Sequence, residues 1–148
     1  MMNIVVIIIS GILGATVTFY ISDKLKQSAV RSSASLSLIV ALFFHFFPEI
    51  LNAYLSKNIP LVFIGTSFIG MVSFKVRGSY FRLAVAGILF STVYINKSDF
   101  FEGFGGALGT LAFISLLTTI GVSDFILRST KIKKGILKIR KKLLDRRL

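Results

Sequence analysis

Two ionisable side chains near the middle of the sequence are the residues best suited to chemistry. The segment "FFHFFPEI" (43–50) holds the only histidine of the chain, His45, and Glu49 follows on the far side of Pro48. Imidazole and carboxyl groups take up and release protons, and within membrane segments they mark ion and proton pathways. Together with Asn52, they form a candidate polar path for an ion or a proton.

The spacing of these residues predicts a shared helical face that points into the protein. Small or polar residues recur at intervals of four, four, four and three, at Ser37, Ala41, His45, Glu49 and Asn52. On one continuous helix they would lie on the same side. A structural interpretation is the simpler alternative, in which the imidazole donates to a backbone carbonyl and the carboxyl group caps or anchors the helix at the membrane interface. With one histidine and no nearby carboxylate cluster, we expect no metal site.

The composition of the chain is that of a membrane protein. Its 148 residues are 54% hydrophobic, and their mean hydropathy is +0.81. A hydrocarbon core about 30 Å thick needs about 20 helical residues. We therefore expect an all-α fold, a polytopic membrane helix bundle with about five transmembrane spans, followed by a basic amphipathic helix. The expected spans are residues 3–21, 33–55, 60–74, 80–95 and 100–122.

Proline and acidic residues suggest where some of these spans bend or begin. Pro48 should bend the second span, and Pro60 should open the third, because proline suits the first helical turn. Asp99 and Glu102 have the spacing of a helix N-cap and the third residue after it, which predicts the start of the fifth span.

Positive charge divides the loops into two groups. Of the eighteen basic residues, sixteen lie in the first and third loops with their flanks and in the C-terminal tail, whereas the second and fourth loops carry only Lys57 and Lys97. Cytoplasmic loops collect Lys and Arg. This division predicts a multi-pass protein of the cell membrane, with its N-terminus outside and its C-terminus in the cytoplasm.

Small residues at helical spacing predict close contacts between the helices, because membrane helices associate through close packing and polar contacts. An oligomer interface and a conduit lined by exposed backbone are alternatives to packing within one chain. The candidate packing residues are Gly11, Gly14, Gly65, Gly70, Gly105 and Gly109.

The tail, residues 123–148, is predicted to be a cytoplasmic amphipathic helix separate from the transmembrane bundle of residues 1–122. Four apolar residues, Ile132, Ile136, Ile139 and Leu143, form a stripe among basic ones. Such a helix favours the anionic inner leaflet, and docking on a partner helix is the alternative. We expect no nucleic acid partner. The residues expected to bind anionic lipid are Lys131, Lys133, Lys134, Lys138, Arg140, Lys141 and Lys142.

These patterns narrow the function without naming it. The chain has no cysteine, and we recognise no nucleophile–base pair, paired carboxylates or cofactor motif, so neither an enzyme nor a cofactor is expected. A transport or pore-forming protein, as a single chain or as an oligomer, is narrowly favoured, because the polar face occurs together with a weak repeat of two Gly-rich spans, residues 60–73 and 101–115. A structural or accessory subunit of a larger membrane complex is the alternative. A basic tail after several spans is also similar in architecture to phage holins.

Overall fold

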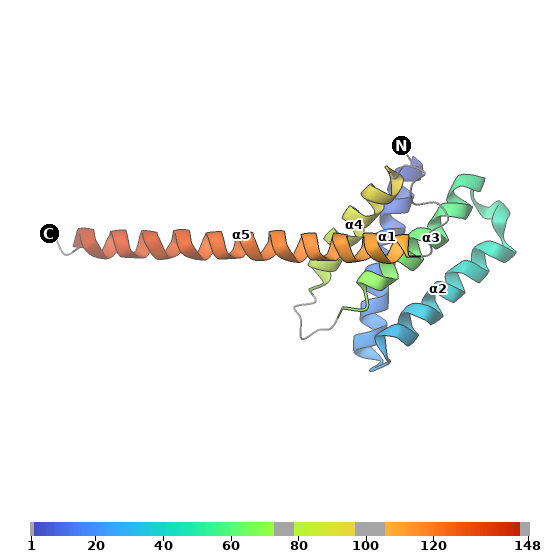
Figure 1. Cartoon of the computed structure of the whole chain (residues 1–148), viewed down its shortest axis with the longest axis horizontal. Helices are drawn as coiled ribbons and strands as arrows, with labels where there is room; N and C mark the ends of the chain where they lie inside the picture. Colours follow the sequence, from blue (N-terminus) through green and yellow to red (C-terminus); the bar gives the residue numbers. More distant parts are fainter. Residues whose placement is uncertain (1, 73–78, 97–105, 146–148) are drawn as a thin grey trace.

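The computed structural model describes residues 2–72, 79–96 and 106–145, and for residue 128 and residues 130–145 it describes the backbone alone. The described part is helical, which confirms the expected all-α fold class (Figure 1). Five α-helices and one short 3₁₀ helix, η1, follow one another along the chain: α1 (Met2–Lys24), α2 (Ala29–Phe46), η1 (Pro48–Ile50), α3 (Ala53–Ile69), α4 (Tyr80–Ile95) and α5 (Ala107–Asp145).

Three helices are long and apolar enough to cross a membrane. They are α1, α2 and the first part of α5, Ala107–Leu127. The other two are shorter, with 17 residues in α3 and 16 in α4. At 1.5 Å per residue these two extend about 24–26 Å, less than the roughly 30 Å of a hydrocarbon core. The described helices are therefore compatible with a membrane location and supply three candidate spans.

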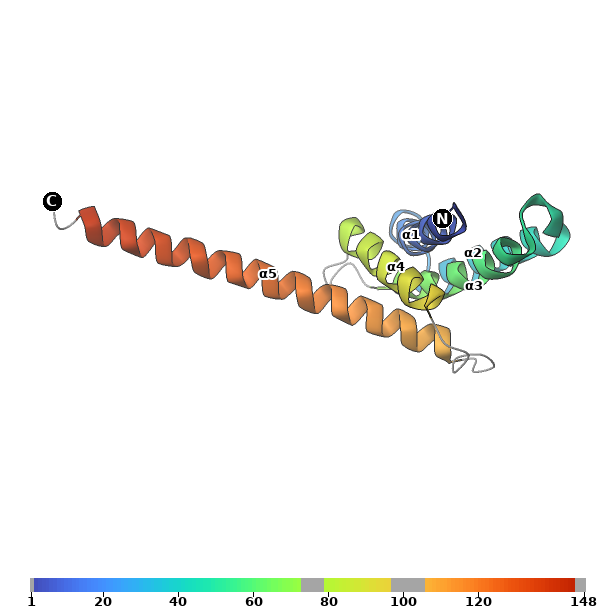
Figure 2. The same cartoon turned by 90° about the horizontal axis from the view of Figure 1, so that it is seen from above.

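Helices α1, α3 and α4 form the centre of the bundle. Their fully buried side chains include Ile7, Val62 and Phe90. Helix α2 lies against α3 at the edge, and the first part of α5 packs on α3 and α4 (Figures 1 and 2). Large apolar side chains remain exposed on α2, among them Leu38, Ile39 and Leu42. This outer surface suits lipid or another protein better than water.

The predicted second span, residues 33–55, is wrong at its C-terminal end. Helix α2 ends at Phe46, and Phe47 leaves the helical region with φ −126° and ψ 59°. The cause is Pro48, whose ring disfavours the helical conformation of the preceding residue. Pro48 then begins η1, and the chain turns back into α3 instead of continuing as a bent helix.

The predicted start of the third span is also wrong. Helix α3 begins at Ala53, after Asn52, so Pro60 lies inside the helix. Glycine at position 70 caps the C-terminal end, earlier than the predicted end at residue 74. The fourth helix begins and ends at the predicted residues, 80 and 95. The predicted N-cap of the fifth span, Asp99 with Glu102, lies outside the described residues, and the described helix begins at Ala107.

Helix α5 differs from the others in length and direction. Its 39 residues run without interruption through residue 122, where we expected the bundle to end and the tail to begin. Figures 1 and 2 show its C-terminal half projecting away from the other helices. The same views show α5 crossing the direction of α1. The two helices therefore cannot both lie along a single membrane normal.

Candidate functional site

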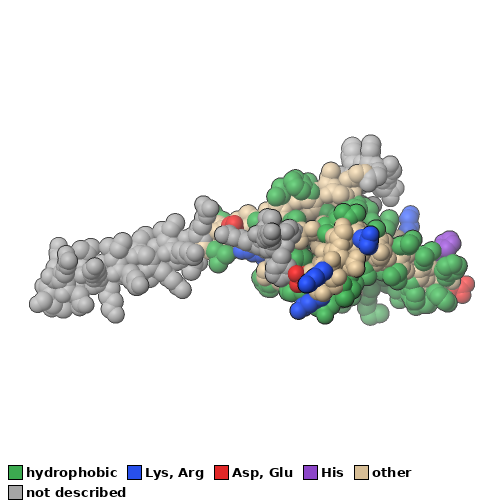
Figure 3. All heavy atoms as spheres, turned by 90° about the horizontal axis from the view of Figure 1, so that it is seen from below, with side chains coloured by type: hydrophobic (Ala, Val, Ile, Leu, Met, Phe, Trp, Pro, Cys, Tyr) green, Lys and Arg blue, Asp and Glu red, His purple; other side chains and the backbone are tan. Residues whose placement is uncertain are grey.

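The residues predicted to form a polar path lie at the α2–α3 turn. His45 is in the last turn of α2, Glu49 is in η1, and Asn52 directly precedes α3. All three side chains are exposed. The histidine, the purple side chain in Figure 3, protrudes from one end of the molecule. The turn thus brings the three residues to the same end of the bundle, outside its interior.

The predicted shared helical face does not form, because the helix ends before Glu49. His45 contacts the ring of Phe46, with 5.6 Å between the ring centroids. Neither the imidazole of His45 nor the carboxyl group of Glu49 makes a hydrogen bond or an ion pair with another residue in the described part of the chain. Asn52 Nδ2 lies 3.4 Å from Asn3 Oδ1 on α1. The prediction that the imidazole and the carboxyl group point into the bundle is wrong in this structure.

Glycine residues hold α1 close to its two central neighbours. A methyl group on Gly70 of α3 would lie 2.5 Å from the carbonyl oxygen of Ala15 on α1. One on Gly87 of α4 would lie 2.8 Å from the carbonyl oxygen of Gly11 on α1. At Gly14 of α1 the nearest atom is the side-chain hydroxyl of Thr66, and the carbonyl oxygen of Phe63 on α3 follows at 3.0 Å. These positions admit no side chain unless the facing backbones separate.

The other candidate packing glycines lie in different surroundings. Gly65 of α3 faces the ring of Phe90 on α4, so a flexible side chain, and not backbone, occupies the space beside it. Among the described residues, no atom outside its own helix backbone lies within 4 Å of a methyl group built on Gly109. Gly105 lies outside the described residues. Of the predicted glycines, Gly11, Gly14, Gly65 and Gly70 are therefore at helix contacts, and Gly109 is not.

Two adjacent hydroxyl residues of α3, Thr66 and Ser67, lie at the centre of the bundle, and both are fully buried. Thr66 faces α1, where it meets Gly11 and Gly14. Ser67 faces α2, with its Oγ 2.7 Å from Ser33 Oγ and 3.2 Å from Ser37 Oγ. Helix α3 thus joins α1 and α2 through neighbouring residues that point in different directions.

Most of these buried hydroxyls also bond to their own helix. Thr66 Oγ1 donates to the Val62 carbonyl at 2.8 Å, and Ser91 Oγ donates to the Gly87 carbonyl at 2.9 Å. Within the described residues, two buried hydroxyls of α1, Ser10 Oγ and Thr18 Oγ1, have no hydrogen-bond partner. A buried polar group without a partner costs about 1–3 kcal/mol in water-soluble proteins. Back-bonded hydroxyls and close glycine contacts together favour a tightly packed interior over a water-filled one.

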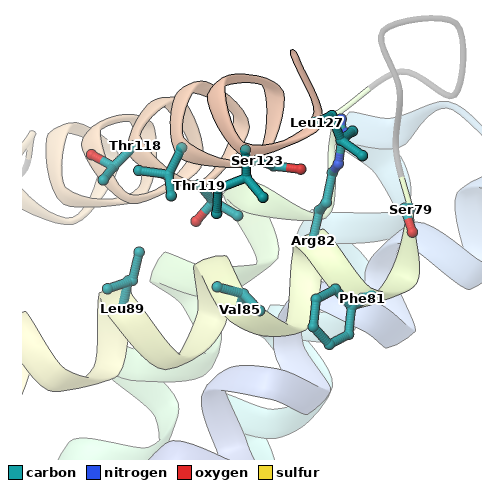
Figure 4. A pocket seen from close by; sticks show the side chains of 11 residues that line it. Ser79, Phe81, Arg82, Val85, Leu89, Thr118, Thr119, Ser123 and Leu127 are labelled. Atoms are coloured by element: carbon teal, nitrogen blue, oxygen red, sulfur yellow. The ribbon is translucent and has the colours of Figure 1, made fainter. Parts of the chain in front are cut away.

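An ion pair joins α4 to α5 near one end of the bundle. Arg82 Nη2 lies 3.3 Å from Asp124 Oδ1, and the two side chains are 14% and 30% exposed. A groove runs beside this pair between the two helices, with a volume of about 640 Å³. Figure 4 shows Arg82 reaching from α4 toward α5, with Thr119 and Ser123 pointing back from α5.

This ion pair and the serine contact were missed in the sequence. Asp124 was detectable, because it is one of six acidic residues and directly follows a long apolar stretch. Its pairing with Arg82, 42 positions away, depends on how the helices pack. Ser33 and Ser67 gave no comparable signal, because serine is common at helix contacts and on helix surfaces alike.

The remaining predicted sites stay untested. The tail residues expected to bind lipid lie on the helical backbone of α5, and their side chains are outside the described part. Among the described residues, no group of three His, Cys, Asp or Glu side chains could hold a metal ion.

Comparison with known proteins gives no independent indication of function. No protein-family model, curated protein or solved structure matches this chain.

Proposed function

We propose that this chain is a structural or accessory subunit of a membrane assembly. The observation that carries the proposal is the packing of α1, α3 and α4. Gly11, Gly70 and Gly87 bring backbones into contact, and the hydroxyl of Thr66 at the same contacts bonds within its own helix. Such an interior supports anchoring better than conduction, since conduction needs water or mobile polar groups along the path.

Two outward-facing features support a role in assembly. Helix α2 exposes apolar side chains along its outer face, including Leu38 and Leu42. Helix α5 extends beyond the bundle and carries eight of the eighteen basic residues, all at or after position 128. A basic helix of this kind suits an anionic membrane surface or an acidic partner. We propose that α5 attaches the bundle to one of these surfaces through Lys131, Lys133, Lys134, Lys138, Arg140, Lys141 and Lys142.

A transport or pore-forming oligomer is the second candidate. It is favoured by the exposure of His45, Glu49 and Asn52 at one end of the molecule. In an oligomer, ionisable groups on that surface would line a path between copies, as a holin-like pore would also require. The bundle of one copy would then remain closed.

A flux assay on the purified protein in liposomes separates the two candidates. A structural subunit should give no proton, ion or small-solute flux above that of empty vesicles. A transport oligomer should give flux that changes with pH and is lost in Glu49→Gln, which keeps the size of the side chain and removes its ionisable group. The matched control is Asp23→Asn, because Asp23 is an exposed acid near the C-terminal end of α1, away from the α2–α3 turn.

Both candidates rest on a membrane topology that we also propose. The N-terminus lies outside, the C-terminus lies in the cytoplasm, and five helices cross. Since α5 crosses the direction of α1, all five can span only if both helices tilt away from the normal in different directions, and tilts reach about 40°. Reporter fusions at the two ends test this topology. Two ends on the same side would contradict it and point to α5 lying along the membrane surface.

A further inference from the structure

The groove between α4 and α5 combines an apolar length with a cationic end. Val85 and Leu89 line it from α4, and Thr118 and Val122 line it from α5 (Figure 4). Arg82 and Ser123 lie at one end. Leu89 is seven residues from Arg82, so the apolar part extends about 10 Å along the helix.

The guanidinium group at that end has an unused donor. Arg82 Nη2 is taken by Asp124, but Nη1 is buried and has no hydrogen-bond partner among the described residues. A buried charged donor without a partner is unfavourable, and a phosphate oxygen satisfies it better than any neutral group. Ser79 and Ser123 also line the groove. Asp124 opposes an anion there, although its charge is already paired with the guanidinium group.

We propose that this groove is a binding site for an anionic phospholipid. The phosphate accepts from Arg82 Nη1, and one acyl chain fills the groove past Val85 toward Leu89. This inference rests on the membrane location proposed above and is independent of the choice between the two candidate functions. It also differs from attraction of lipid to the basic tail, since it uses one guanidinium group and an acyl chain that lies in the groove.

The headgroup should decide which lipid binds. In the bilayer an acyl chain already contacts other acyl chains, which are as apolar as the groove. Moving the chain into the groove therefore contributes little to the binding free energy. The part of the binding free energy that differs between lipids is the hydrogen bond from Arg82 Nη1 to the headgroup. The site should therefore prefer phosphatidylglycerol to phosphatidylcholine, whose choline group neutralises the phosphate. A free phosphate ion lacks the chain and should bind poorly.

Photo-crosslinking tests the proposal on the full chain in phosphatidylcholine nanodiscs. The probes are phosphatidylglycerol and phosphatidylcholine, each with a diazirine on one acyl chain, at 0.5 M salt to suppress attraction to the tail. We expect phosphatidylglycerol to label residues 79–89 and 118–127. In Arg82→Gln/Asp124→Asn, which removes both charges together, this labelling should fall about tenfold, as for the loss of one charge-assisted hydrogen bond. Arg31→Gln, at an exposed arginine of α2, should label as the unchanged chain does.

A second variant, which keeps both charges, tests the same proposal if the double variant does not fold. Leu89→Trp leaves both charges in place and fills the groove, and it should reduce labelling by both lipids. Equal labelling by the two lipids, or unchanged labelling in both variants, would overturn the proposal. So would labelling confined to the tail, or competition by inorganic phosphate alone. Detergent-dependent extraction of the protein, measured on the same preparations, reports separately whether the membrane location itself is wrong.

Discussion

The glycines of the central helices and those of α5 are the same residue in opposite surroundings. Gly70 and Gly87 lie against the backbone of α1. At Gly106, Gly109 and Gly121 of the α5 region, no atom of another described segment lies within 4 Å of the methyl position. Small-residue spacing therefore indicates where two helices can approach closely, and the partner helix determines whether they do. Alanine should lower the free energy of unfolding where the glycine lies against another backbone, and should raise it slightly where the glycine faces open space.

The largest effect should come from Gly70→Ala. The added methyl group meets the Ala15 carbonyl oxygen and the Thr18 Cβ, so α1 and α3 must move apart. We expect a loss of about 3 kcal/mol in the free energy of unfolding, at the upper end of overpacking costs. Reversible denaturation in mixed micelles measures this loss. The matched control is Gly109→Ala, which meets open space and should stabilise the helix by up to about 1 kcal/mol. Destabilisation of similar size in both variants would contradict the comparison.

An intermediate effect is expected at Gly65, because the obstacle there is a side chain. The methyl group of Gly65→Ala would meet the ring of Phe90, which is fully buried. We expect a loss of about 1–2 kcal/mol. Adding Phe90→Leu should make Gly65→Ala less costly than it is in the unchanged background, and a double-mutant cycle measures that coupling. Strict additivity of the two substitutions would show that the helices relax elsewhere.

The smallest effects concern the buried hydroxyls, and they should differ in sign. Ser67→Ala removes the contacts with Ser33 and Ser37, and should cost about 0.6 kcal/mol, typical of a hydrogen bond between membrane helices. Thr18→Val replaces a buried hydroxyl that has no partner among the described residues, so stability should stay level or rise. Melting temperatures measured in one detergent compare the two variants. A greater loss in Thr18→Val would mean that its hydroxyl has a partner such as bound water.

The helices could be predicted wherever hydrophobicity alone decides their limits. The fourth helix was predicted correctly at both ends because polar residues border an apolar run, at Ser79 and Asn96. Around Pro48 and Pro60, the sequence allowed two interpretations of each proline, as a bend inside a helix or as its boundary. The structure uses Pro48 at a boundary and Pro60 inside a helix, the reverse of what we expected. Proline restricts the local backbone, and the packing of the whole hairpin decides between these outcomes.

The candidate site was less predictable for the same reason. His45 and Glu49 have the spacing of one helical face. Because α2 ends at Phe46, the two residues do not share a helix, and both lie exposed at the α2–α3 turn. The contact between Arg82 and Asp124 joins residues on different helices, and no periodicity within one helix encodes it. Composition and hydrophobic periodicity predict individual helices, whereas a site forms from residues on different helices.

Because α5 is one continuous helix, its projecting C-terminal part and the part packed against the bundle should move together as a rigid rod. From Asp124, where the helix is paired with α4, to its end at Asp145 the helix extends about 31 Å at 1.5 Å per residue. A tilt of about 10° at the ion pair moves the far end by about 5 Å on that geometry. Conversely, a pull on the basic end arrives as torque at the contacts that α5 makes with α3 and α4, among them the salt bridge and the groove beside it. Events at the far end of α5 and events at these contacts are thereby mechanically linked.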